Sequence, residues 1–358
     1  MNKILKPSLM DFTSKELEAL ITPKFRVKQI FDWLYNSFVS EYKDMKNIPN
    51  SMKDELAKKY LVNPLKIAKK EKSSDGTIKY LLELQDGKTI EAVWLKMKNE
   101  LRDESKNIYQ EAKYTICIST QVGCKVGCTF CLTAKGGFTR DLTAGEIVAQ
   151  VVTLKQDNDH KQSRKVNIVY MGMGEPLDNL TNLTQAIEIF KEVDGLDIGG
   201  KRQTVSTSGL SAKIDRLGKM DLGVHIAISL HAVDDKLRSE LIPMNKAHNI
   251  QSIIDAVKRF PIDTRKRVMF EYLVIKGKND DIKSAKKLVK LLTDIKAKVN
   301  LIYFNPYPGT HYDRPDHTDM LAFQEYLMKH GLLCTIRDSK GIDISAACGQ
   351  LQEKSNAI

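Results

Sequence analysis

Apolar residues recur at helical spacing early in the chain and alternate with polar residues further on. Residues 13–35 and a segment that begins after Pro49 carry the helical pattern. Residues 77–96 alternate around an Asp86-Gly87 turn, which predicts a β-hairpin. The polar residues 97–112 are expected to form a loop.

From residue 114 the pattern changes to repeated units of a short apolar strand followed by a helix. The predicted strands span residues 114–120, 166–171, 203–208, 224–231, 267–275, 299–305 and 332–337. The predicted helices span residues 143–155, 180–193, 211–217, 250–260, 281–295 and 320–330. This alternation predicts a parallel sheet with helical crossovers, as an open doubly wound sheet or as a barrel.

These patterns divide the chain into four segments. We expect a helical basic unit at 1–75, a β-hairpin and linker at 76–112, an α/β body at 113–340 and a polar C-terminal tail at 341–358.

Composition places the chain among ordinary globular proteins. Of 358 residues, 42% are hydrophobic and 28% are charged, so a sizeable core is possible. No stretch approaches the ~18 apolar residues of a membrane helix, and the N-terminus lacks the apolar run of a secretory signal. We therefore expect a cytoplasmic protein with no membrane partner.

Positive charge is in excess and unevenly distributed. The net charge is +11, and residues 1–72 hold 15 Lys and Arg against 9 Asp and Glu, a net of +6. Such an excess suits a nucleic-acid binder, because basic side chains neutralise phosphates and release counterions. A basic surface that only aids solubility is the alternative interpretation.

The predicted strand ends carry polar and glycine-rich sequences. These are Met171-Gly172-Met173-Gly174-Glu175-Pro176, Ser206-Thr207-Ser208-Gly209, Ser229-Leu230-His231 and Asn305-Pro306-Tyr307-Pro308-Gly309. In parallel α/β folds, functional groups gather at the carboxyl ends of the strands. A single shared pocket explains the coincidence most simply.

Three of the six cysteines, Cys124, Cys128 and Cys131, fall within eight residues. Structural zinc usually takes four ligands in two spaced pairs, and no fourth ligand lies nearby in the sequence. Three thiolates instead suit an iron–sulfur cluster that keeps one iron open, although a zinc site stays possible at this point. Cys334 lies in an apolar strand and is expected in the core.

The spacing C-x3-C-x2-C, with Phe130 before the last cysteine, resembles the signature of radical S-adenosylmethionine (SAM) enzymes. The strand-end sequences above and Ile344-Ser345-Ala346-Ala347-Cys348-Gly349-Gln350-Leu351 are similar to the RlmN/Cfr family, and the likeness covers essentially the whole chain. The resemblance implies an α/β fold, an incomplete (βα)6-type barrel with a small helical N-terminal domain that binds RNA.

The resemblance also implies roles for individual residues. Cys124, Cys128 and Cys131 would ligate one [4Fe–4S] cluster. The SAM pocket would consist of Gly174, Glu175, Ser206, Ser229, Leu230, His231 and Asn305. Cys348 would carry the methyl group, Cys117 would pair with it in a disulfide, and Glu91 would accept a proton. Without the family, Ser206, His231 and Glu91 are also compatible with a plain strand-end hydroxyl, a strand cap and a surface hairpin residue.

The implied function is methylation of carbon 2 of adenosine 2503 in 23S rRNA and of adenosine 37 in tRNAs. Two SAM molecules would be consumed per methyl group, with flavodoxin or ferredoxin as electron donor and a monomeric enzyme. A Cfr-type enzyme, which methylates carbon 8, is the closest alternative, and Pro176 favours the RlmN branch. A non-catalytic RNA-binding protein with a structural metal centre is a more distant one.

Overall fold

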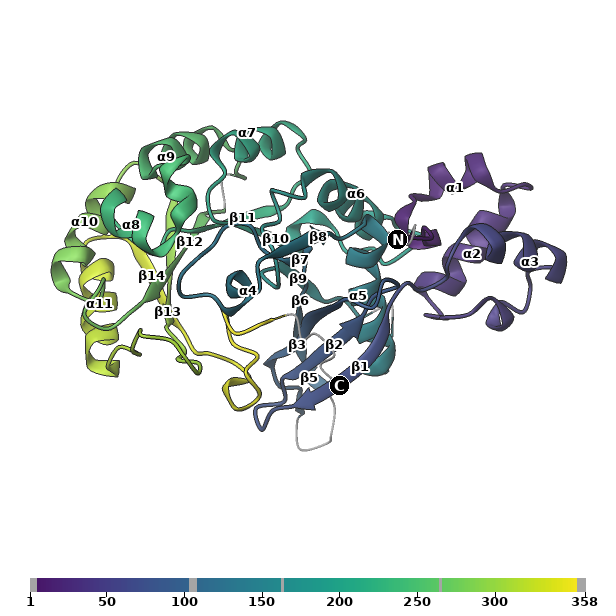
Figure 1. Ribbon diagram of the computed structural model, residues 1–358, viewed down its shortest axis with the longest axis horizontal. Helices are drawn as coiled ribbons and strands as arrows, with labels where there is room; N and C mark the ends of the chain where they lie inside the picture. Colours follow the sequence, from purple (N-terminus) through teal and green to yellow (C-terminus); the bar gives the residue numbers. More distant parts are fainter. Residues whose placement is uncertain (1–4, 103–107, 162–163, 264–265, 353–358) are drawn as a thin grey trace.

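The chain folds into one long mixed sheet with helices along its outer face and a small helical unit at one end (Figure 1). The computed structural model describes residues 5–102, 108–161, 164–263 and 266–352. No helix in these ranges is both long and apolar enough to span a membrane.

The helical unit at the N-terminus follows the predicted apolar spacing. It consists of α1 (Ser14–Leu20), α2 (Phe25–Tyr35) and α3 (Asn50–Lys59), with 3-10 turns at Leu9–Asp11 and Tyr42–Asp44. In α2 the side chains of Val27, Ile30 and Leu34 are buried along one face. The buried side chains of the unit are continuous with the core of the sheet and its helices.

Ten strands form the sheet, in the order β1-β2-β3-β6-β9-β10-β11-β12-β13-β14. Their bounds are β1 Lys66–Lys72, β2 Ile78–Glu83, β3 Thr89–Lys98, β6 Lys113–Cys117, β9 Asn167–Tyr170, β10 Gln203–Thr207, β11 His225–Ser229, β12 Val268–Val274, β13 Ala297–Tyr303 and β14 Leu333–Arg337. Strands β1, β2, β3 and β6 pair antiparallel, whereas β6 and the strands after it pair parallel. Strands β1 and β14 end the order, so the barrel is incomplete, as expected.

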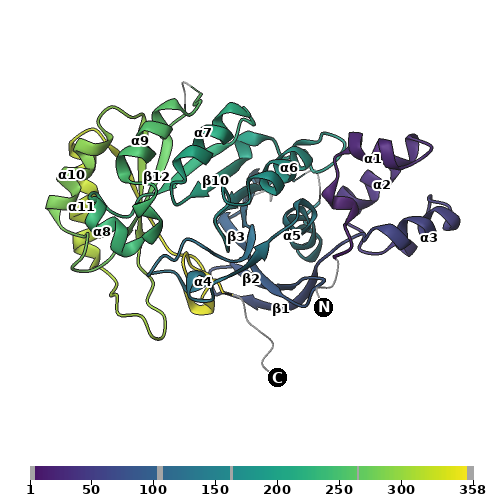
Figure 2. The same ribbon diagram turned by 45° about the horizontal axis from the view of Figure 1, so that its top comes forward.

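Helices connect the parallel strands and cover their outer face (Figures 1 and 2). They are α5 Ala144–Asp157, α6 Leu180–Lys191, α7 Ser211–Lys219, α8 Asp235–Leu241, α9 Ile250–Arg259, α10 Ile282–Leu292 and α11 His317–Lys329. The crossover topology confirms the predicted α/β class.

Helix α5 is buried along almost its whole length because the N-terminal unit covers the side that faces away from the sheet. The backbone N–H of Gly145 donates to Asp11 Oδ1 at 2.6 Å. A Cβ at Gly145 would lie 2.8 Å from the Asp11 carboxyl carbon, so the contact requires glycine.

Several elements differ from the sequence predictions. Strand β1 falls within the segment expected to be helical; it is an exposed edge strand and therefore lacks apolar alternation. The predicted loop contains the short strands β4 (Leu101–Arg102) and β5 (Ile108–Gln110), and its residues 103–107 lie outside the described residues. Helix α8 and the pair β7 (Gln121–Gly123) and β8 (Phe138–Asp141) were not predicted.

Candidate active site

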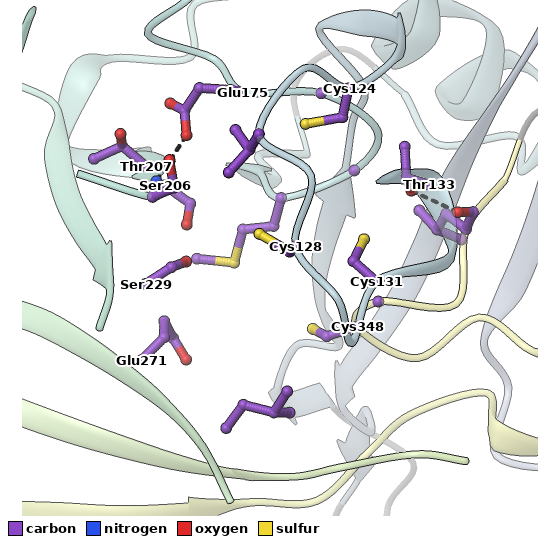
Figure 3. Close-up of a pocket in the computed structure, with 18 of the residues that line it drawn as sticks. Cys124, Cys128, Cys131, Thr133, Glu175, Ser206, Thr207, Ser229, Glu271 and Cys348 are labelled. Carbon is purple, nitrogen blue, oxygen red and sulfur yellow. Dashed lines mark hydrogen bonds between the residues drawn. The ribbon is translucent and has the colours of Figure 1, made fainter. Parts of the chain in front are cut away.

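A pocket lies at the carboxyl ends of the parallel strands, where the sequence predicted it (Figure 3). Residues from six strands or strand ends, from the cysteine loop and from the C-terminal tail line it. The lining residues with polar, ionisable or sulfur-containing side chains include Cys124, Cys128, Cys131, Glu175, Ser206, Ser229, His231, Glu271, Arg337 and Cys348.

The three clustered cysteines lie on the loop between β7 and the short helix α4 (Leu132–Lys135). The base of this loop is fixed by close backbone contact, since Cys124 N–H donates to Gly137 O at 2.7 Å. Gly123 has φ +76°, and a Cβ there would lie 2.0 Å from Gly137 O. Only glycine permits this approach, which turns the loop toward the pocket.

Burial governs the chemistry of these thiols. Burial, with smaller contributions from the charges of Glu175 and Cys131, raises the pKa of Cys124 to about 12. Burial also raises the pKa of Cys128 well above its usual value, with Cys131 and Cys124 adding to the effect. The raised pKa values favour the protonated thiols of Cys124 and Cys128, which would release their protons on binding a metal centre.

The arrangement fits an iron–sulfur cluster. Within the described ranges, no three His, Cys, Asp or Glu side chains converge closely enough to hold one metal ion. The three thiols instead line a common pocket whose opposite wall carries hydroxyl and carboxyl groups (Figure 3). Thiolates are the usual ligands of iron–sulfur clusters, and three of them leave one iron free for another ligand.

Gly174 and Glu175 form the turn after β9. Gly174 has φ +103°, and a Cβ there would lie 2.6 Å from the Gln121 side chain. The Glu175 carboxylate accepts backbone N–H groups from Ser208 at 2.7 Å and Leu177 at 3.1 Å. Burial raises the pKa of Glu175, and these hydrogen bonds oppose the rise. The carboxylate thus joins two strand ends while it lines the pocket.

Other predicted SAM-pocket residues separate into two groups. Ser206, Ser229 and His231 line the pocket. Leu230 and Asn305 are buried but do not line it. The Asn305 side chain donates to Ser339 Oγ at 3.0 Å and accepts from Arg314.

His231 is held as a neutral ring. Its Nδ1 accepts the backbone N–H of Leu273 at 2.9 Å, and its ring packs edge-on against Phe130. Burial lowers the pKa of His231 to about 3, with the positive charge of Arg238 contributing. The ring therefore serves as a fixed wall of the pocket.

Arg238 on α8 is a residue that the sequence analysis missed. Its buried guanidinium donates to the carbonyls of Leu230, Ser208 and Ser229, and to Asn245. It thereby joins the ends of β10 and β11, two of the strands that carry pocket residues. A lone arginine in a short amphipathic segment gives no local signal of such contacts.

Cys117 and Cys348 meet at a second, adjoining cavity. Cys117 ends β6, Cys348 lies on the C-terminal tail, and both line this cavity together with Arg337. Cys348 is an exposed residue that also lines the main pocket. Burial raises the pKa of the Cys348 thiol, and the guanidinium of Arg337 opposes that rise. All six cysteines are free thiols, so the expected disulfide is not formed in this structure.

Glu91 lies on β3 and does not line the main pocket. It is 1% exposed, and its carboxylate lies 3.6 Å from Lys79 Nζ. Its Oε2 accepts the backbone N–H of Gln352 at 2.9 Å. Glu91 is thus a buried anchor for the C-terminal tail rather than a surface residue of a hairpin.

Two contacts also hold the tail against the cysteine loop. Leu132 N–H donates to Gly349 O at 2.8 Å, and Thr133 Oγ1 donates to Leu351 O at 2.5 Å. Leu132 directly follows Cys131, so the segment that carries Cys348 is fixed next to the cysteine loop.

Family comparisons agree with this geometry. The radical SAM superfamily matches residues 118–291, and the ribosomal RNA large subunit methyltransferase N-terminal domain matches residues 8–62. These ranges contain the cysteine loop and the helical unit, respectively.

Individual relatives match over nearly full length. The chain is 78% identical over 353 residues to the "Dual-specificity RNA methyltransferase RlmN" of Sulfurimonas denitrificans, which covers 99% of each chain. It is 62% identical to the protein of that name from Nitratiruptor sp., over 98% of each. A crystal structure of a radical SAM methyltransferase from Sphaerobacter thermophilus superposes with a TM-score of 0.88 at 40% identity, over 96% of this chain and 99% of that one.

Proposed function

The chain belongs to the RlmN family of radical SAM RNA methyltransferases, and from this we propose that it methylates carbon 2 of adenosine through a methyl group carried on Cys348. The proposed targets are adenosine 2503 of 23S rRNA and adenosine 37 of tRNAs. The observation that carries the proposal is the position of Cys348, which faces both the pocket of the three-cysteine loop and the cavity of Cys117.

A thiol that carries the methyl group avoids a mismatch in reactivity between SAM and adenine. Carbon 2 of adenine is electron-poor, and the methyl group of SAM is an electrophile, so direct polar transfer between them is unfavourable. A thiolate can take the methyl group first, because sulfur is the strongest nucleophile among the side chains. Cys348 is an exposed residue that lines the pocket; burial raises the pKa of its thiol, and the positive charge of Arg337 opposes that rise.

The residues at the strand ends are proposed to bind SAM. Gly174, Glu175, Ser206, Ser229 and His231 would form the wall that contacts it, and Leu230 and Asn305 would support that wall. When bound to Cys124, Cys128 and Cys131, a [4Fe–4S] cluster would supply the electron that cleaves SAM reductively. Two SAM molecules would be consumed, one for the methyl group and one for removal of a hydrogen atom from it.

The second thiol is proposed to release the product. Addition of the Cys348-bound carbon to the base leaves protein and RNA covalently joined. The adduct keeps one unpaired electron. Attack of the Cys117 thiolate on the Cys348 sulfur would then join the two sulfurs and break the sulfur–carbon bond, while the carbon takes up a proton to become the methyl group and the surplus electron passes to the electron-transfer partner. A reductant would later separate the two sulfurs. Glu91 is proposed to accept the carbon 2 proton, with Lys79 stabilising its carboxylate. Because Gln352 covers that carboxylate, this role requires movement of the tail.

RNA would be held mainly through its phosphates. The basic segment 1–75 is proposed to bind the phosphate backbone of the RNA, while the target adenosine unstacks from its neighbouring bases and enters the pocket. Flavodoxin or ferredoxin is proposed as electron donor, and a monomer as the active form.

Analysis of modified nucleosides tests the proposal. The reconstituted enzyme, SAM and a reductant are incubated with 23S rRNA and tRNA from a strain that lacks the gene, and the digests are analysed by mass spectrometry. We expect 2-methyladenosine. The 8-methyl isomer would move the protein to the Cfr-type alternative, and absence of any C-methylated adenosine would refute the proposal.

A further inference from the structure

Glu271 is a buried carboxyl group that the proposed mechanism does not use. It lies on β12, is 3% exposed and lines the main pocket, into which its carboxylate turns (Figure 3). Its Oε1 accepts a hydrogen bond from Asn300 Nδ2 at 3.0 Å. Its Oε2 is buried and has no hydrogen-bond partner in the part of the chain that the structure describes. An unsatisfied carboxylate oxygen is costly, so this group suits a ligand that donates a hydrogen bond.

The orientation of Glu271 is set by a row of side chains across three parallel strands. Glu271, Asn300 and Thr335 are register partners on β12, β13 and β14. Thr335 Oγ1 donates to Asn300 Oδ1 at 2.7 Å, which directs the Asn300 amide nitrogen toward Glu271. The Asn300 amide nitrogen therefore donates to Oε1 of Glu271, which leaves Oε2 as the acceptor that faces the pocket.

Arg337 presents donors beside this acceptor. It lies two residues after Thr335 on β14, so the two side chains share one face of the strand. It lines both the main pocket and the cavity that Cys117 and Cys348 share. Its one hydrogen bond seen among the described residues is a weak contact of 3.9 Å with Met171 Sδ, and no ion pair joins it to Glu271 there. Cationic donors and a carboxyl group thus face the same space next to the Cys348 thiol. Burial raises the pKa of the Glu271 carboxyl, and the positive charge of Arg337 opposes that rise.

We infer that Glu271 and Arg337 recognise the Watson–Crick edge of the target adenine. Along that edge, reactive carbon 2 is followed by ring nitrogen 1, an acceptor, and then by the 6-amino group, a donor. Cys348, Arg337 and Glu271 offer matching groups to these three positions. The inference rests on the proposed function, and it names how the enzyme would select adenine once the base has left the stack.

Analogues of the target base test the assignment of Glu271. The full-length protein is titrated with a stem-loop RNA that carries adenosine, or purine riboside without the 6-amino group, at the target position. We expect the wild type to bind adenosine about tenfold or more tightly than purine riboside. In Glu271→Gln the amide oxygen stays with Asn300 and the NH2 group faces the base, so this preference should disappear. Glu83→Gln, on strand β2 outside the pocket, is the matched control.

Two results would overturn the assignment. An unchanged preference for the 6-amino group in Glu271→Gln would show that another residue reads it. Loss of 5′-deoxyadenosine formation without RNA, with normal RNA discrimination, would place Glu271 against SAM instead. Thr335→Val provides a milder variant that keeps the carboxylate and should reduce the preference only in part. Because affinity is measured without methyl transfer, failure of the methylation would not affect the comparison.

The Arg337 assignment is tested with deaza analogues. We expect the wild type to bind RNA with 1-deazaadenosine more weakly than RNA with adenosine, and Arg337→Met to bind the two equally. Replacement by 7-deazaadenosine should have no effect. Sensitivity to the 7-deaza analogue in place of the 1-deaza analogue would show that the opposite edge of the base is read, and would overturn the inference.

Discussion

Individual polar residues around the pocket differ in how fully the protein satisfies them. Arg238 donates to several carbonyls, and both oxygens of Glu175 accept backbone N–H groups. Such groups fix the shape of the site, because breaking a buried hydrogen bond leaves an unpaired polar atom. Glu271 Oε2 has no such partner among the described residues. This contrast separates residues that build the pocket from one that suits a ligand.

His160 allows a test of burial at the residue scale. It is 6% exposed and packs against the rings of Trp94 and Tyr114, which link β3 to β6. Burial, with help from Lys155, lowers the pKa of His160 to about 4. Between about pH 6.5 and pH 4, His160 is protonated in the unfolded chain but stays neutral in the folded chain. The contribution of neutral His160 to the free energy of unfolding is therefore complete above about pH 6.5 and decreases as the pH falls toward 4.

Chemical denaturation of the cofactor-free protein at pH 7 and pH 5 measures this effect. The wild type should lose more free energy of unfolding between the two pH values than His160→Phe, by on the order of 1 kcal/mol. Phenylalanine preserves the aromatic packing, so packing loss should contribute little. Equal losses in the two proteins would mean that His160 titrates normally in the folded state.

Spacing in the sequence was enough to place the three clustered cysteines at one pocket, while their role as cluster ligands stays a prediction. Cys124, Cys128 and Cys131 share one short loop, and all three line the pocket as expected. Arg238, Glu271 and Arg337 were missed, because each lies in an ordinary helix or strand pattern and its partners come from distant strands. Glu91 was identified only through the family resemblance, and its contact with Gln352 spans 261 positions of the chain.

Among the elements, the C-terminal tail shows how a segment with little regular structure can be positioned. Backbone groups of Gly349, Leu351 and Gln352 bond to helix α4 and to Glu91 on β3. These contacts hold the Cys348 segment between the cysteine loop and the hairpin. The position of the C-terminal tail therefore depends in part on its hydrogen bond to Glu91.

Glu91→Gln should loosen this tail. A hydrogen bond to a carboxylate contributes about 1 kcal/mol more than a neutral one, which corresponds to a roughly fivefold change in local opening. We expect the amide of Gln352 to exchange with deuterium several-fold faster in this variant. Glu83→Gln on β2 is the control and should leave the rate unchanged. The same rate in Glu91→Gln and wild type would show that Glu91 does not anchor the tail.

Element prediction followed the strength of the local pattern. The parallel strands and their crossover helices are apolar enough to show their periods, and most appear within a few residues of the expected ranges. Strand β1 was missed because Lys66–Lys72 is nearly all exposed at the sheet edge. The β7–β8 pair was missed because its close approach depends on Gly123 and Gly137, which are separated by the cysteine loop.

At the scale of the whole molecule, the helical unit and the pocket are parts of one RNA-binding surface in our proposal. Replacing Lys24 and Lys28 by glutamine removes two exposed positive charges near α2. If both contact phosphates, the slope of log affinity for single-stranded target RNA against log salt should fall by about 1.4.

A matched pair of substitutions separates contact from general charge. Lys286→Gln and Lys290→Gln remove the same charge from α10, at the opposite end of the molecule (Figure 1). This pair should change the slope far less. Equal changes for the two pairs would mean that net charge, rather than the N-terminal unit, determines the salt dependence.

The two-thiol mechanism is tested most directly by the covalent species that each cysteine variant accumulates. Cys117→Ala can still accept a methyl group on Cys348 and add it to the base, but it lacks the thiol that breaks the sulfur–carbon bond. We expect it to trap RNA on the protein, as a nuclease-sensitive band in denaturing electrophoresis, with adenine joined through carbon 2 to the Cys348 methylene. Cys348→Ala should form neither product nor adduct. Normal turnover by Cys117→Ala without an adduct would contradict the account.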